Sequence, residues 1–85
     1  MKILKFKEQH NVTGSRIKLL RNQKQITQEQ LAARLQTYGI QVDQKAISRL
    51  ENGQRVITDY ELILIARILN VSVDDLIQDE IYDRT

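Results

Sequence analysis

The chain of 85 residues contains no cysteine, no proline and no tryptophan, and only three glycines. Without cysteine, neither a disulfide nor a cysteine-based zinc site can stabilise the core. Without proline and with few glycines, little in the sequence interrupts helices. We therefore expect one small all-α domain of short helices, near the lower size limit for independent folding.

Long apolar runs are also missing. The longest, residues 62–66 (LILIA), is far too short to span a bilayer. Basic and polar residues interrupt the apolar ones in the N-terminal segment MKILKFKEQH, which is therefore unlike a signal peptide. These features predict a cytoplasmic protein with no membrane partner.

The groups that enzymes use are scarce. The chain has one histidine, no cysteine, no glycine-rich phosphate loop and no paired carboxylates of a recognisable cleft. A single histidine without a cluster of cysteines or carboxylates is typical of an ordinary surface residue, which is our interpretation of His10. We expect no catalysis, no metal and no cofactor.

Charge is unevenly distributed along the chain. Residues 1–55 contain eleven Lys/Arg and four Asp/Glu, a balance of +7. Residues 56–85 contain two Arg and seven Asp/Glu, a balance of −5. A basic first part and an acidic end indicate that the first part meets a polyanion.

Capping residues predict where helices begin. Asn11 is a suitable N-cap for a helix to about residue 24. Thr27 with Gln30 three residues later makes a capping box for a helix to about residue 35. Asp43 is the expected N-cap of a third helix, which stops at Gly53.

Two more helices are expected: one from residue 58 or 59 to 69, and one that opens at Ser72 with Asp75 in a second capping box. Apolar residues at helical spacing predict the buried faces. In the first three helices these are Val12, Ile17 and Leu20 with Leu19 on the flank, then Leu31, Ala32, Leu35, Ala46, Ile47 and Leu50. In the last two they are Tyr60, Ile63, Leu64 and other aliphatic residues of the fourth helix, and Val73, Leu76 and Ile77 of the fifth.

The second and third helices resemble a helix-turn-helix, in which the second helix of the motif enters the DNA major groove. The outward positions of this helix, about residues 43–52, are Gln44, Lys45, Ser48 and Arg49. Glutamine can read adenine, and arginine or lysine can read guanine. Gln28, at the start of the preceding helix, can bind a phosphate with the free backbone N–H groups there. The alternative is an ordinary solvated face.

Four motifs together resemble the phage repressor and Cro type of DNA-binding domain, the XRE family. They are Arg21 in the first helix, TQEQLA at 27–32, IS..E.G at 47–53 and IA..L.VS...L at 65–76. The resemblance covers about residues 11–78 and implies a compact five-helix domain. Residues 1–10 would then be an N-terminal arm, a short strand or an apolar flap, and residues 79–85 a C-terminal tail.

The resemblance also implies roles for particular residues. Arg21 would form a structural ion pair with Glu51, so the carboxylate in the last turn of the third helix would not contact DNA. The DNA phosphates would be held by Thr27, Gln28, Asn52 and Arg55.

One feature departs from the family pattern. In the family pattern, counted from Ala32, the buried apolar residue of the third helix would fall at position 42. The sequence Glu-Asn-Gly at 51–53, which ends this helix, instead places that residue at Ile47. About five residues are therefore extra within QTYGIQV at 36–42, and the turn is longer than the usual three or four residues. Ile40 and Val42 are expected to pack under this turn.

These features predict a sequence-specific, repressor-like regulator that binds double-stranded DNA as a homodimer on a palindromic operator. The expected interface is the fifth helix and the tail, through Val73, Ile77, Ile81 and Tyr82, although these residues could equally cover the monomer's own core. One alternative is a controller or antitoxin-type operon regulator. Another is a protein-interaction module that uses the fifth helix, which the basic first part disfavours.

Overall fold

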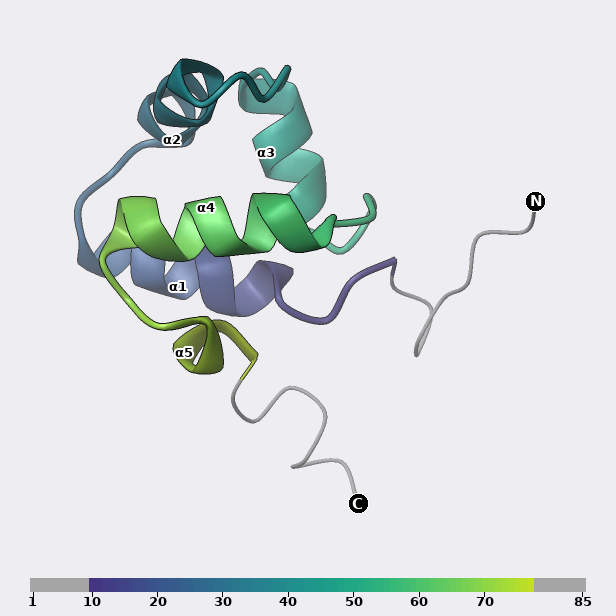
Figure 1. Cartoon of the computed structure of the whole chain (residues 1–85). Helices are drawn as coiled ribbons and strands as arrows, with labels where there is room; N and C mark the ends of the chain where they lie inside the picture. The colour runs from purple at the N-terminus through teal and green to yellow at the C-terminus, as the bar shows by residue number, and fades with distance from the viewer. Residues whose placement is uncertain (1–9, 78–85) are drawn as a thin grey trace.

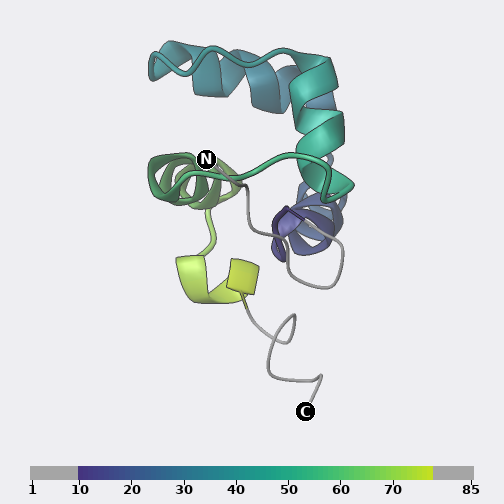
Figure 2. The ribbon, with the colours of Figure 1, turned by 90° about the vertical axis from the view of Figure 1, so that its right-hand side faces the viewer.

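The computed structural model describes residues 10–77, which form five α-helices and no strand. The helices are α1 (Gly14–Gln23), α2 (Gln28–Thr37), α3 (Gln44–Glu51), α4 (Asp59–Leu69) and α5 (Val73–Ile77). The predicted all-α, five-helix fold is thus confirmed. Helices α2 and α3 lie at one end of the molecule and α5 at the other, with α1 and α4 between them (Figures 1 and 2). The predicted arm, apart from residue 10, and the predicted tail lie outside the described residues.

Side-chain caps fix the starts of the middle helices. Thr27 Oγ1 accepts a hydrogen bond from the N–H of Gln30 at 3.0 Å, and Gln30 Oε1 accepts one from the N–H of Thr27 at 2.9 Å. Thr58 and Glu61 form the same reciprocal pair at α4, at 3.2 and 3.0 Å. These boxes satisfy backbone N–H groups that have no partner within the helix, so local sequence determines both starts.

The start of α1 differs from the prediction. This helix begins at Gly14 with Thr13 as its N-cap, so the assignment of Asn11 as N-cap was wrong. Asn11 instead accepts a hydrogen bond from the N–H of Gly14 at 2.8 Å and donates to the carbonyls of Leu50 at 3.0 Å and Arg55 at 2.7 Å. Its amide therefore ties the start of α1 to the end of α3, a tertiary role that local sequence does not reveal.

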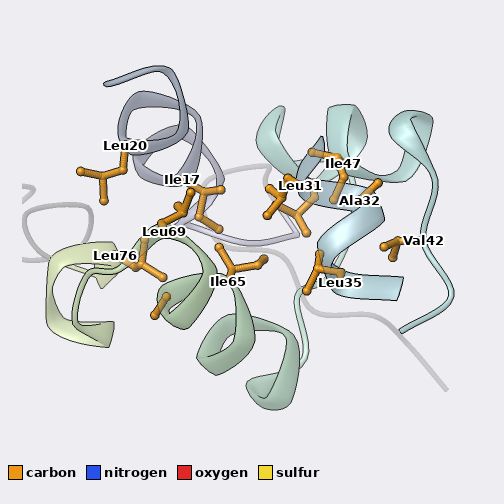
Figure 3. Packing of buried hydrophobic residues seen from close by; sticks show 12 residues of the cluster. Ile17, Leu20, Leu31, Ala32, Leu35, Val42, Ile47, Ile65, Leu69 and Leu76 are labelled. Carbon is orange, nitrogen blue, oxygen red and sulfur yellow. The ribbon is translucent and has the colours of Figure 1, made fainter. Parts of the chain in front are cut away.

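The core lies between the helices, and each of the five contributes at least one residue to it (Figure 3). Its buried apolar residues are Ile17, Leu20, Leu31, Ala32, Leu35, Val42, Ile47, Leu50, Ile65, Ala66, Leu69 and Leu76. Most of the expected core of the first three helices is among them. Val12 is only half-buried because it precedes the first helical turn.

The predicted buried face of α4 was wrong in part. Tyr60 and Ile63 are 55% and 54% exposed, whereas Ile65 and Leu69 are fully buried. The buried stripe also includes Glu61, whose charge is paired with Arg55. The face that α4 turns toward the core therefore differs from the purely apolar face expected from the sequence. A stripe that begins with a glutamate cannot be recognised from hydrophobic spacing alone.

The long connection between α2 and α3 is confirmed. It spans residues 38–43 and runs back along α2 to the start of α3 (Figure 2). Val42 is part of the core, with only 6% of its surface exposed, and Ile40 packs against the core. The side-chain amide of Gln36 donates a hydrogen bond from Nε2 to the carbonyl of Val42 at 2.6 Å. The extra residues therefore form an anchored segment, and Tyr38 and Gln41 remain on the surface.

Candidate nucleic-acid interface

A buried ion pair positions α3. Arg21 Nε donates to Glu51 Oε2 at 2.6 Å and Arg21 Nη2 donates to Glu51 Oε1 at 3.0 Å, with the side chains only 8% and 1% exposed. The remaining nitrogen, Nη1, donates to the carbonyl of Ile26 at 2.7 Å. The arginine thus holds together α1, the end of α3 and the segment before α2. This bidentate pairing explains why a carboxylate occupies the last turn of α3 despite the unfavourable helix dipole.

Hydrogen bonds extend from this buried pair to the surface. Gln28 Nε2 donates to Glu51 Oε1 at 3.0 Å, and Gln28 Oε1 accepts from Gln44 Nε2 at 2.6 Å. The structure therefore brings together two residues that the sequence assigned to different tasks, phosphate binding for Gln28 and base reading for Gln44. Both amides are oriented by a network that begins at Arg21.

The outer face of α3 carries the other residues predicted to read bases. Lys45 and Arg49 are exposed, and Ser48 is half-buried. Lys45, Ser48 and Arg49 follow Gln44 by one, four and five positions. This spacing places all four residues on one face of the helix. Within residues 10–77, neither Lys45 nor Arg49 has a side-chain hydrogen bond or ion pair. Both cations are available to an external partner.

The loop after α3 is compact. Asn52 is its exposed first residue and donates its backbone N–H to the carbonyl of Ser48 at 3.1 Å. The N–H of Gln54 donates to the carbonyl of Arg49 at 2.8 Å. These bonds close the end of α3 and fix the direction in which the loop leaves it.

Arg55, predicted to contact phosphate, is paired with Glu61. Its Nη2 lies 2.8 Å from Oε2 and its Nη1 lies 3.1 Å from Oε1. Burial alone would raise the pKa of Glu61, but hydrogen bonds from Arg55 and from the N–H of Thr58 outweigh it and hold that pKa below its usual value. The hydrogen bond with Glu61 raises the pKa of Arg55. The arginine side chain is still 25% exposed, so part of it faces solvent.

His10 lies beside the same loop, a position that was not predicted. Its backbone N–H donates to the carbonyl of Gly53 at 2.8 Å. The residue lines a cleft of about 400 Å³ together with Arg49, Gln54, Arg55, Val56 and Thr58. The contact is made through main-chain atoms of residues far apart in sequence, so no local pattern could have predicted it.

This arrangement, two helices joined by a turn with a polar outer face on the second, agrees with the comparison to known families. A family model described as helix-turn-helix matches residues 17–76. The chain belongs to the XRE-type helix-turn-helix family. Its members bind DNA, and the protein is a DNA-binding transcription regulator. No curated protein matches the chain.

The family match covers most of α1 and extends almost to the end of α5. In this helix-turn-helix protein, α2 and α3 form the motif, and the other three helices complete the domain around the core. No helix within residues 10–77 has the length and apolarity needed to cross a membrane. In the same residues, no group of three or more His, Asp or Glu side chains is placed to hold a metal.

Proposed function

We propose that the protein is a sequence-specific, repressor-like regulator that inserts α3 into the major groove of double-stranded DNA. The observation that carries this proposal is the division of α3 into two faces. Ile47, Leu50 and Glu51 are buried, whereas Lys45 and Arg49 project outward. In the complex, Lys45 and Arg49 donate to guanine, Ser48 contacts a neighbouring base, and each bidentate pair gives about 1–3 kcal/mol of discrimination.

The role of Gln44 follows from its hydrogen-bonding groups. One N–H of its amide donates to Gln28, which leaves one N–H and the carbonyl oxygen. A donor and an acceptor side by side match N7 and N6 of adenine in the major groove. We therefore assign Gln44 to adenine, in an orientation set by Gln28.

The phosphate contacts are proposed at the start of α2 and after α3. The amide of Gln28 donates one N–H to Glu51, and the second N–H is left for a phosphate oxygen. The hydroxyl of Thr27 accepts from Gln30 and can donate its own proton to the same phosphate. On the other side of α3, Asn52 and the solvent-facing part of Arg55 hold a second phosphate.

We further propose that the protein acts as a homodimer on a palindromic operator. One recognition helix contacts few base pairs, and two-fold dimers reach half-sites about 34 Å apart. In α5, Leu76 is buried and Val73 packs against the protein's own core, so Ile77 is the described residue left for an interface. The other two predicted contacts, Ile81 and Tyr82, lie outside the described residues.

The test is a binding titration with a random duplex and with duplexes selected from a pool, each at two salt concentrations. We expect a linear decrease of log K with log salt, selection of a palindrome, and loss of sequence preference in Arg49→Ala. Arg67→Ala is the matched control because it removes the same charge from an exposed position on α4. If no DNA binds even at low salt, the domain is a protein-interaction module, and α5 becomes the surface to examine.

A further inference from the structure

We propose that protonated His10 binds a DNA phosphate in the cleft beside the end of α3, and that DNA affinity therefore depends on pH. In this contact, an imidazolium N–H donates to a phosphate oxygen. The inference rests on the DNA-binding function proposed above and adds a titratable contact to it. No sequence motif and no family match assigns this residue, which precedes the matched residues 17–76.

The backbone around His10 is held firmly in place. Its N–H donates to the carbonyl of Gly53 at 2.8 Å. The amide of the next residue, Asn11, donates to the carbonyls of Leu50 at 3.0 Å and Arg55 at 2.7 Å. Three hydrogen bonds thus fasten this segment to the end of α3 and to the loop that is proposed to follow the DNA backbone. The backbone from which the imidazole extends is consequently a fixed part of the proposed interface.

The cleft has the charge that an anion requires. Arg49 enters it from α3 and Arg55 from the loop, whereas no acidic residue lines it. Glu61 of α4 faces Arg55 and forms an ion pair with it at 2.8 Å, so the charge of Arg55 is largely compensated. Arg49 is proposed above to donate to guanine, so His10 is the group of this cleft left to neutralise a phosphate.

Proton binding and phosphate binding favour each other at this site. A bound phosphate stabilises a positively charged imidazole beside it, and a positively charged imidazole in turn strengthens phosphate binding. Histidine is the only side chain whose ordinary pKa lies between pH 5 and 8, and this chain has one histidine and no cysteine. A pH dependence that disappears with His10 can therefore be assigned to a single group.

The experiment uses the full chain and one selected duplex, with affinity measured against salt at pH 5.5 and pH 8.0. Each neutralised phosphate contributes about 0.9 to the slope of log K against log salt. We expect the wild-type slope to be steeper by about 0.9 at pH 5.5, and the slopes of His10→Gln to be equal at both pH values. His10→Arg should give the steep slope at both. Gln54→Ala, which changes the same cleft without a titratable group, should keep the pH difference.

The imidazole can also be observed directly. In an NMR titration of the single histidine, we expect its midpoint to move to higher pH when the duplex is added. An unmoved midpoint, or the same pH dependence of the slope in wild type and His10→Gln, would overturn the inference while DNA binding itself stands. Failure of both proteins to bind DNA at either pH would overturn the proposed function as well.

Discussion

The backbone of Gly14 at the start of α1 lies directly against the carbonyl of Leu50 in the last turn of α3. A Cβ atom at Gly14 would overlap that carbonyl oxygen and would lie 3.0 Å from the carbonyl oxygen of Glu51. The two helices therefore approach each other through main-chain atoms. This close approach, together with the Arg21–Glu51 pair, determines where α3 sits in the domain.

Gly14→Ala is expected to reduce the free energy of unfolding by about 1–3 kcal/mol, because the added methyl has no room. It should also weaken DNA binding, because relief of the overlap moves the end of α3. Gly39→Ala is the control: its φ is +87° and no atom lies within 4 Å of the added Cβ, so backbone strain of about 1 kcal/mol is its only cost. Urea unfolding and DNA titration measure both effects. Wild-type binding by a stable Gly14→Ala protein would contradict the prediction.

Breaking the buried ion pair should cost more. Arg21→Met or Glu51→Leu alone leaves an unpaired buried charge, and we expect each to reduce the free energy of unfolding by about 3–5 kcal/mol. The double variant removes both charges and should be more stable than either single variant. A double-mutant cycle from denaturant unfolding measures the coupling. Additive effects of the two substitutions would show that the pair contributes little.

The pair between Arg55 and Glu61 predicts a pH dependence of stability. The pKa of Glu61 is lower in the folded protein than in the unfolded chain, so its stabilisation is complete above the unfolded pKa of about 4.3 and is lost as pH falls through the folded value. We expect Glu61→Gln to be less stable than wild type by about 1–2 kcal/mol at pH 7. That difference should shrink below about pH 4.

Thermal unfolding of wild type and Glu61→Gln between pH 3 and pH 7 tests this expectation. Glu29→Gln is the matched control because Glu29 is exposed in the first turn of α2 and forms no ion pair among the described residues. A difference between Glu61→Gln and wild type that is as large at pH 3 as at pH 7 would assign the effect to packing.

The proposed homodimer can be tested with two substitutions of the same kind. Ile77→Asp places a charge at a half-buried position of α5 and should yield a monomer in sedimentation experiments. Ile63→Asp places the same charge on α4, where Ile63 is 54% exposed, and should leave the dimer intact. The reverse result would put the interface on α4, where Tyr60 is also exposed.

Much of the fold was predictable because its signals are local. Thr27 with Gln30 forms the expected capping box, and Ser72 and Asp75 form theirs at 3.0 and 3.1 Å. Apolar spacing identified most of the core of the first three helices because charged and polar residues occupy their other faces. In α4 apolar spacing could not distinguish the buried face from the exposed one, since nearly every residue from 62 to 69 is apolar.

The remaining features depend on contacts between residues distant in sequence. The phosphate role of Arg55 was implied by the family resemblance. Its ion pair with Glu61 could not be predicted, because Glu61 is identifiable as buried only once α4 is packed. The side-chain amide of Asn11 and the backbone N–H of His10 donate to main-chain carbonyls at and just after the end of α3. Because every residue type has such a carbonyl, the sequence does not reveal these contacts. The Arg21–Glu51 geometry was implied by family resemblance, whereas its extension through Gln28 to Gln44 could be found only from coordinates.

The contact between Gln28 and Gln44 has a consequence for the entropy of recognition. A glutamine side chain that becomes ordered on binding loses rotamer freedom worth up to about 1.5–2 kcal/mol. In this protein the amide of Gln44 is already restrained at 2.6 Å from Gln28 before DNA arrives. Much of that freedom is lost during folding, so DNA binding should be opposed by a smaller entropy change. Removing Gln28 should then weaken the adenine contact proposed for Gln44, even in a protein whose Gln44 is unaltered.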